Sequence, residues 1–256
     1  MPSNALSLAQ LIIDTVRRDV TEAETVTAYR GPLVRFADAS NPRFSELQRL
    51  VGTDHMLPKD LLVGAESVVS CLIPFEIGVV KANIRDRRAV ADEWALAYVE
   101  TNELIGRIAD HLIALLADRG VRAAAEPATG NFSSDPLTSR WSHKSVAVIA
   151  GLGSFGLHQM VITDAGCAGR LGSLVLDAPL PVAPVHHRER CLWFYDGSCR
   201  ACVERCPTDA LSEDGAIDKE RCWERCLEVA EAYKHLGTVE VCGKCVVGPC
   251  SFESPL

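Results

Sequence analysis

Cysteine is concentrated at one end of this chain, and the spacing of these residues constrains the fold more than any other feature. The chain has 256 residues and 11 cysteines, nine of which lie in the last 66 positions. In chain order the nine are Cys191, Cys199, Cys202, Cys206, Cys222, Cys226, Cys242, Cys245 and Cys250. Cysteines two or three residues apart in a tight loop can direct their thiols to one metal centre. We therefore expect this end of the chain to bind metal.

The order of the spacings indicates two iron–sulfur clusters. The run from Cys199 through Cys202 to Cys206-Pro207 resembles the latter part of the bacterial ferredoxin motif, in which the cysteine before proline ligates the other cluster. Two [4Fe–4S] clusters need eight thiolates. We assign Cys191, Cys199, Cys202 and Cys250 to the first cluster and Cys206, Cys222, Cys242 and Cys245 to the second. Cys226 is left over, and it is the alternative to Cys222.

Three other interpretations remain open. Two structural zinc sites would also use C-x2-C pairs, although they would not call for the Cys206-Pro207 step. A disulfide framework fits the number of cysteines but not a reducing compartment. A single cluster with several spare thiols is the third alternative.

Composition excludes several classes of protein. The chain is 48% hydrophobic, which is enough for a packed core, and its net charge of −8 argues against a protein that coats nucleic acid. Polar residues interrupt the apolar residues of the first 20 positions, and Arg17 and Arg18 follow them, so we expect no signal peptide. No apolar run is long enough for a membrane span. We expect a cytoplasmic protein with no membrane partner and no nucleic-acid partner.

The chain divides by composition into residues 1–185 and residues 186–256. Three prolines in the join, residues 177–184, disfavour helix and favour a stiff, extended crossing. The first part shows α+β patterning, with apolar residues at helical spacing over 3–18 and over 86–119, where Gly120 is placed to end the helix. We expect strands over residues 67–73, 121–125, 145–150, 160–163 and 171–176. Cys71 falls in the first of these strands and is expected to be a core residue.

Four stretches together resemble the epoxyqueuosine reductases and their cobalamin-dependent relatives, which include the reductive dehalogenases. They are residues 64–75, the long helix through 97–120, residues 147–156, and the cysteine-rich end with Cys206-Pro207-Thr208. The resemblance covers residue 60 to the end, and the chain looks closest to short relatives of unassigned function. It implies a nitroreductase-like domain, which binds cobalamin and substrate, followed by a ferredoxin-like domain with two [4Fe–4S] clusters. It also implies that electrons pass from the clusters to corrin cobalt and then to substrate.

The chain departs from the family pattern at two positions. The family's first cluster cysteine is Asp196 here, so either Cys191 replaces it through a longer loop or Asp196 itself ligates. The family's catalytic aspartate aligns with Ser133, and Asp135 is shifted by two residues. Ser133 and Asp135 are therefore the candidates for a catalytic residue, and the resemblance does not carry the family's catalytic aspartate onto this chain.

A glycine-rich segment is the candidate cofactor-binding turn. Its residues are Gly151, Leu152, Gly153, Ser154, Phe155 and Gly156, which match G-x-G-x-x-G after an expected strand. The segment that follows is short for the helix of a dinucleotide site, so the alternatives are a turn packed against the corrin macrocycle or a purely structural turn. His158 either approaches cobalt or is an ordinary hydrogen-bonded residue. His143 and Lys144 either line the site or only lead into the strand, and Cys167 is either inert or near the substrate cavity.

These observations predict an iron–sulfur oxidoreductase that passes electrons from two clusters to a corrinoid or a small molecule in the N-terminal domain. Its electron donor is expected to be a flavodoxin- or ferredoxin-type reductase. The alternative is a non-catalytic electron-transfer protein or a reductive activator for a corrinoid-dependent partner. A third hypothesis keeps the fold and places flavin, or no cofactor, in the larger domain.

Overall fold

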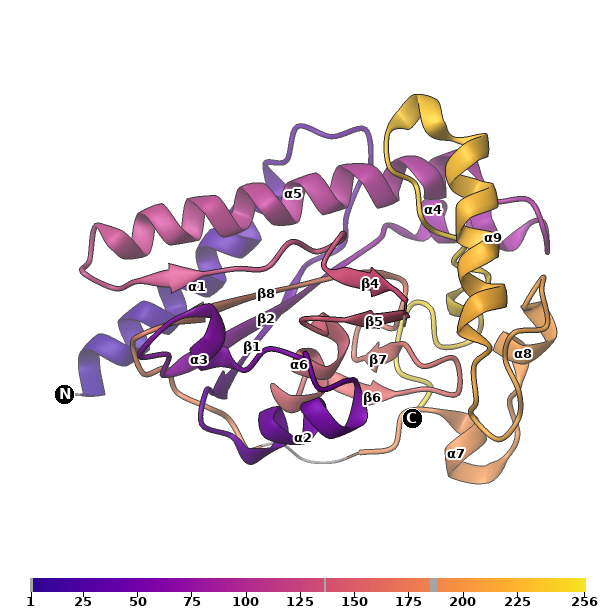
Figure 1. Cartoon of the computed structure of the whole chain (residues 1–256). Coiled ribbons are helices and arrows are strands. Elements are labelled where there is room, and N and C mark those ends of the chain that lie inside the picture. The colour runs from indigo at the N-terminus through magenta and orange to yellow at the C-terminus, as the bar shows by residue number, and fades with distance from the viewer. Residues whose placement is uncertain (1, 136, 185–187) are drawn as a thin grey trace.

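The computed structural model describes residues 2–135, 137–184 and 188–256, and the side chains from residue 8 onward. An antiparallel sheet lies between two layers of helices, and the cysteine-rich segment packs against one end of these layers (Figure 1). The predicted α+β class is confirmed. The predicted boundary at residues 185 and 186 falls outside the described residues.

The central sheet has the strand order β1-β2-β8-β3, and every neighbouring pair is antiparallel. Its strands are β1 (Leu33–Asp38), β2 (Ser67–Pro74), β8 (Gly169–Leu176) and β3 (Ala123–Ala124). Every residue of β2 is buried, because helices cover both faces of the sheet, and this explains its uninterrupted apolar run. Cys71 of β2 is a buried core residue, and burial raises the pKa of its thiol to about 11.

Two helices cover one face of the sheet. They are α1 (Pro2–Thr21) and α5 (Asp92–Ala117), and their apolar stripes share one core with β1, β2 and β8. Gly120 follows α5 with φ +72°, a left-handed conformation that suits glycine and ends the helix as predicted. The helix begins six residues later than predicted. The Asp86 carboxylate accepts hydrogen bonds from the backbone N–H groups of Arg88 and Ala89, which fixes a turn between α4 (Ile77–Ile84) and α5.

Three helices cover the other face: α2 (Pro42–Leu50), α3 (Pro58–Leu61) and α6 (His143–Ile149). The expectation of a strand over residues 145–150 is wrong, because these residues form α6. The Ser142 side chain accepts a hydrogen bond from the Ser145 N–H and caps the helix. A short apolar run has the same pattern in a buried strand and in a buried helix, and the N-cap serine is the signal that separates them.

Two hairpins lie beside α6, β4 (Phe132–Ser134) with β5 (Leu137–Ser139) and β6 (Gly153–Phe155) with β7 (Val161–Thr163). The cysteine-rich segment contributes short helices and turns. These are α7 (Leu192–Asp196), α8 (Ala201–Arg205), α9 (Lys219–Ala232), and the 3-10 turns η1 (Lys234–Leu236) and η2 (Lys244–Val246).

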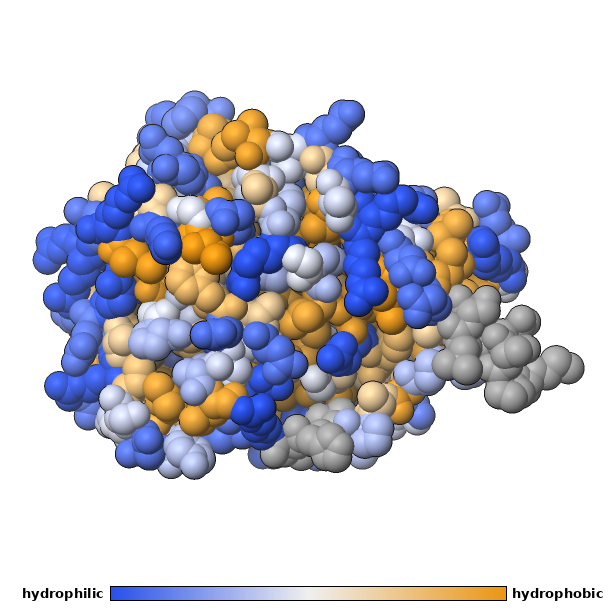
Figure 2. Space-filling model, turned by 180° about the vertical axis from the view of Figure 1, so that it is seen from behind, coloured by the Kyte–Doolittle hydropathy of each residue, from blue (hydrophilic) through white to orange (hydrophobic). Residues whose placement is uncertain are grey.

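The cysteine-rich segment shares a core with the first part of the chain. Cys191, Cys202 and Cys206 belong to the same apolar cluster as Phe75 and Trp94. No membrane-spanning helix is found in the part of the chain that the structure describes, because no helix there is both long enough and apolar enough to cross a membrane. On the rear face, apolar side chains reach the surface in patches separated by charged residues (Figure 2).

Candidate metal centres

The first group of thiols surrounds one pocket. Cys191 caps α7, Cys199 lies in the following loop, Cys202 is in α8, and Cys250 approaches from the end of the chain. All four line the pocket, and so does Cys245, which the spacing assigned to the second cluster. The other lining residues are His158, Ile162, Leu192, Ala201, Gly248, Pro249 and Pro255. The structure therefore brings together the four thiols assigned to the first cluster in a largely apolar setting.

Cys191, and not Asp196, lines this pocket. The Asp196 side chain is exposed and accepts a hydrogen bond from the Ser198 N–H, which lowers the pKa of its carboxyl. This geometry favours the longer loop from Cys191 over ligation by Asp196.

Cys250 has two close polar neighbours. Its Sγ lies 3.7 Å from Sγ of Cys167 and 3.4 Å from Nε2 of His158. The His158 Nδ1 accepts a hydrogen bond from the Met160 N–H, so Nε2 carries the proton and donates to the sulfur. The hydrogen bonds from Cys167 and His158 lower the pKa of the Cys250 thiol to about 5. The sequence predicted that Cys167 is either inert or near a substrate cavity. In the structure its sulfur contacts Cys250, a candidate cluster ligand.

The second group contains the other candidate ligands and the spare. Cys206 follows α8, and its sulfur accepts a hydrogen bond from the Ala210 N–H at 3.2 Å. Cys222 and Cys226 lie one turn apart on α9 and are hydrogen-bonded to each other, which lowers the pKa of Cys222 to about 7 and raises that of Cys226. Cys242 precedes η2 and Cys245 lies within it, and burial raises the pKa of both thiols. Both cysteines of α9 thus face this group.

Unpartnered polar atoms around the second group test whether an anionic cluster fits there. Among the described side chains, five buried nitrogen or oxygen atoms have no hydrogen-bond partner: Ser70 Oγ, Trp94 Nε1, Ser154 Oγ, Arg205 Nε and Arg225 Nε. The three nitrogens all lie beside the second group. Trp94 packs on Gly243, Arg205 interacts electrostatically with Lys244 of η2, and Arg225 interacts with Cys242. Because buried donors are normally satisfied, these N–H groups fit the sulfurs of a bound cluster.

The glycine-rich segment leads from α6 into the β6–β7 hairpin, and not from a strand into a helix. A dinucleotide turn is therefore excluded here. A Cβ at Gly153 would lie 2.1 Å from the Ile162 carbonyl oxygen, and a Cβ at Gly156 would lie 2.9 Å from Cε1 of His158. Leu152 is buried. Gly153 and Gly156 thus permit close approach of the chain's own atoms.

The two catalytic candidates lie on the exposed β4–β5 hairpin. Ser133 Oγ donates to the Asp135 carbonyl oxygen at 2.9 Å, and both side chains are exposed. The hairpin packs against α9, where the Phe132 and Trp223 rings meet edge to face at 5.0 Å. Lys219 Nζ of α9 donates to the Leu137 carbonyl oxygen. The hairpin therefore packs against α9, the helix that carries Cys222 and Cys226, and the Asp135 carboxylate on it is exposed.

The residues that precede the glycine-rich segment have different roles. His143 is buried, with Nδ1 2.8 Å from Ser173 Oγ and Nε2 3.0 Å from the Pro127 carbonyl oxygen. Desolvation lowers its pKa to about 4, so it is a neutral structural residue. Lys144 instead lies near Cys245 and Cys222.

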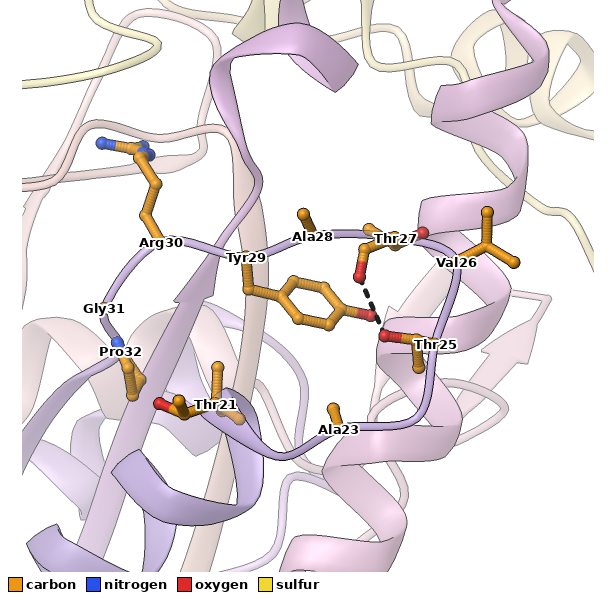
Figure 3. A pocket seen from close by; sticks show the side chains of 11 residues that line it. Thr21, Ala23, Thr25, Val26, Thr27, Ala28, Tyr29, Arg30, Gly31 and Pro32 are labelled. Carbon is orange, nitrogen blue, oxygen red and sulfur yellow. Dashed lines mark hydrogen bonds between the residues drawn. The ribbon is translucent and has the colours of Figure 1, made fainter.

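A separate hollow of about 340 Å³ lies inside the arch formed by residues 20–32. Tyr29 points into the arch, where its hydroxyl accepts a hydrogen bond from Thr101, and Arg30 points away from it (Figure 3). Arg30 instead donates to the carbonyl oxygens of Phe75, Ala165 and Phe252. No charged side chain points into the hollow in Figure 3, so we assign it no ligand.

Sequence reasoning missed the polar residues around the second group. Arg205, Arg225 and Lys244 each lie next to a cysteine in the sequence, which is a signal that was available. Trp94 and Lys144 carry no such signal, because they come from the first part of the chain and meet the cysteines only in the folded protein.

Comparison with known proteins identifies relatives. No family model matches the chain. An epoxyqueuosine reductase from Pseudomonas aeruginosa is 28% identical over 234 residues, which are 86% of this chain and 60% of that protein. The chain spans less than two thirds of the length of such curated relatives.

Solved structures share the fold. An epoxyqueuosine reductase with an epoxyqueuosine-modified tRNA-Tyr stem loop superposes with a TM-score of 0.63 at 18% identity, over 96% of this chain and 66% of that one. A catabolic reductive dehalogenase superposes with a TM-score of 0.55 at 17% identity, over 87% of this chain and 30% of that one.

Proposed function

Because the chain belongs to the epoxyqueuosine reductase family, which is structurally related to the reductive dehalogenases, we propose that it is an iron–sulfur reductase. Two [4Fe–4S] clusters are held by the ligand sets Cys191, Cys199, Cys202, Cys250 and Cys206, Cys222, Cys242, Cys245. One observation carries the proposal: nine cysteines spread over 66 residues gather in two adjacent groups, and six of the nine belong to one apolar core.

The chain's own residues keep the two groups close together. Cys245 lines the pocket of the first group, and its thiol is also affected electrostatically by Cys202 and Cys206. A bound [4Fe–4S] cluster supplies one electron at a time at low potential. Apolar side chains around the first group exclude water, while His158 donates a hydrogen bond to Cys250 and fixes its orientation.

The electron enters through the first group. The α7 helix, which begins directly after Cys191, exposes two aromatic side chains, Phe194 at 49% and Tyr195 at 66%. The proposed donor, a flavodoxin- or ferredoxin-type reductase, contacts this helix. The electron acceptor is a small molecule or a corrinoid bound by the first 185 residues.

A second candidate function is electron transfer to a corrinoid-dependent partner without a substrate of its own. The exposed position of Ser133 and Asp135 favours it, because an exposed side chain is not enclosed together with a substrate. The proposal does not include the tRNA stem loop that one relative binds.

Anaerobic reconstitution with iron and sulfide tests the cluster proposal. We expect close to eight iron atoms per chain. An iron content near four atoms per chain would mean that the protein holds one cluster and not two. Tightly bound zinc without iron would overturn the proposed reductase function. Titration with cobalamin then separates the acceptors, because a spectral change with saturable binding would identify the corrinoid. Turnover of a small-molecule acceptor without any protein partner would exclude the second candidate.

A further inference from the structure

Four cationic side chains surround the second thiol group. Lys144 of α6 interacts electrostatically with Cys245 and Cys222, and Lys244 of η2 interacts with Cys242. Arg225 of α9 interacts with Cys242 as well, and Arg205 of α8 immediately precedes Cys206. The four come from separate elements, so only the folded chain assembles them.

Two of these cations, Lys144 and Arg205, have no acidic partner among the described residues, and Lys244 forms no ion pair but is attracted electrostatically to Asp86. Lys244 is 1% exposed, and its Nζ donates to the backbone oxygen and Oδ1 of Asn83, both at 2.7 Å. Lys144 donates to the Gln159 carbonyl oxygen, and Arg205 donates to the Ile84 carbonyl oxygen. Of the ion pairs among the described residues, none includes Lys144, Arg205 or Lys244. Burial of a cation without an anion is unfavourable, so the site lacks its negative charge.

The unpartnered donors point to the same missing anion. The Nε atoms of Arg205 and Arg225 and the indole Nε1 of Trp94 are buried without an acceptor. A four-cysteine [4Fe–4S] cluster presents thiolate and sulfide acceptors and carries net negative charge. The second group therefore offers both the charge and the hydrogen bonds that such a cluster would use.

The first group differs in both respects. Its pocket is lined by cysteines, His158 and apolar residues, and it contains no lysine or arginine. The nearby arginines are already paired: Arg190 with Asp164, and Arg200 with Glu204 and Glu213.

We infer that Lys144, Arg205, Arg225, Lys244 and Trp94 give the second cluster the higher reduction potential, so that the electron rests there. Reduction adds one negative charge to a cluster, and nearby cations and N–H donors stabilise that charge. The step is a one-electron exchange: the reduced first cluster is oxidised and the oxidised second cluster is reduced. Both groups adjoin the first part of the chain, the first through His158 and Ile162 and the second through Asn83 and Trp94. This inference rests on the proposed two-cluster function.

A redox titration of the reconstituted full chain, followed by electron paramagnetic resonance, tests the inference. We expect two separate potentials in the unaltered protein. The Cys199→Ala variant, which retains only the second cluster, should show the higher one. Equal potentials in the unaltered protein, or the lower potential in Cys199→Ala, would overturn this inference. If the unaltered protein still held eight iron atoms per chain, the proposed two-cluster function would stand.

Two substitutions identify the residues responsible. Lys144→Met should lower the higher potential and leave the lower one unchanged, and Lys144→Arg should restore it because the charge is kept. Trp94→Phe removes the unpartnered N–H while keeping an aromatic ring, and it should lower the same potential by a smaller amount. The control is Arg200→Met, an exposed and acid-paired residue near the first group, which should change neither. An unchanged higher potential in both Lys144→Met and Trp94→Phe, with full iron content, would refute the assignment.

Discussion

The indole ring of Trp94 lies directly against the backbone of Gly243, so that a Cβ at position 243 would be 2.3 Å from Nε1, Cε2 and Cζ2 of that ring. Trp94 belongs to the start of α5, and Gly243 lies between Cys242 and Cys245. This contact joins the central helix of the first part of the chain to the loop that presents two candidate ligands. Gly243 also has φ +71°, which disfavours any residue with a side chain.

We expect Gly243→Ala to lose the second cluster selectively, because the loop must move away from Trp94. Iron content after reconstitution should fall from about eight to about four atoms per chain. The matched control is Gly248→Ala, whose Cβ would meet Ala201 Cβ at 3.6 Å in ordinary contact. Full iron content in Gly243→Ala would contradict the prediction.

Arg30 connects three segments near the first thiol group. Its guanidinium donates to the carbonyl oxygens of Phe75, Ala165 and Phe252, at 3.0, 2.7 and 2.8 Å. Hydrogen bonds from a charged donor each contribute about 1.5–3 kcal/mol, so Arg30→Met should destabilise the fold by about 2 kcal/mol or more. The segment that carries Cys250 should also become less firmly held, so that iron is lost to a chelator more rapidly. Urea unfolding and the rate of iron loss to a chelator measure both effects, and equal rates in the two proteins would show that Arg30 does not hold this end.

His143 makes stability depend on pH. Its pKa is lowered to about 4 by burial, whereas a free histidine titrates near 6.5. Above pH of about 6.5 the residue is neutral in both states, and below it the unfolded chain binds a proton that the folded chain does not. Stability is therefore lost as pH falls from about 6.5 to about 4, by up to about 3 kcal/mol over the whole window.

The measurement is the urea midpoint between about pH 7 and pH 5, compared with His143→Gln, which lacks this titration. The difference between the two proteins isolates His143 from acid effects on the clusters and from His55, whose pKa burial also lowers. The variant's midpoint should fall less steeply with pH. Parallel curves would mean that His143 is already protonated in the folded protein.

The two cysteines of α9 remain to be separated as ligands. We expect Cys226→Ala to keep about eight iron atoms and Cys222→Ala to keep about four. The hydrogen bond from Cys226 and, to a smaller extent, the nearby Lys144 lower the pKa of the Cys222 thiol and so favour its thiolate. The reverse pattern of iron content would make Cys226 the ligand and Cys222 the spare.

Local patterns predicted most of the first part of the fold. The buried strand β2, the strand β8 and the long helix α5 follow from periodicity and from Gly120, because these signals lie within the segment itself. The helix α6 is the exception, since the six apolar and small residues 145–150 fit a strand or a helix, and only the N-cap at Ser142 separates the two. The glycine-rich segment has the pattern of a cofactor turn, yet its glycines accommodate Ile162 and His158.

The sequence by itself determined the number and spacing of the cysteines, and hence the expectation of two clusters and of their family. Only the tertiary structure decided what surrounds each group of thiols. Lys144 and Trp94 lie far from the second group's cysteines along the chain, and packing of α5 and α6 against α9 and η2 brings them there. Electrostatic interactions act through space and not along the chain, so the charge around each cluster could not be inferred from spacing alone.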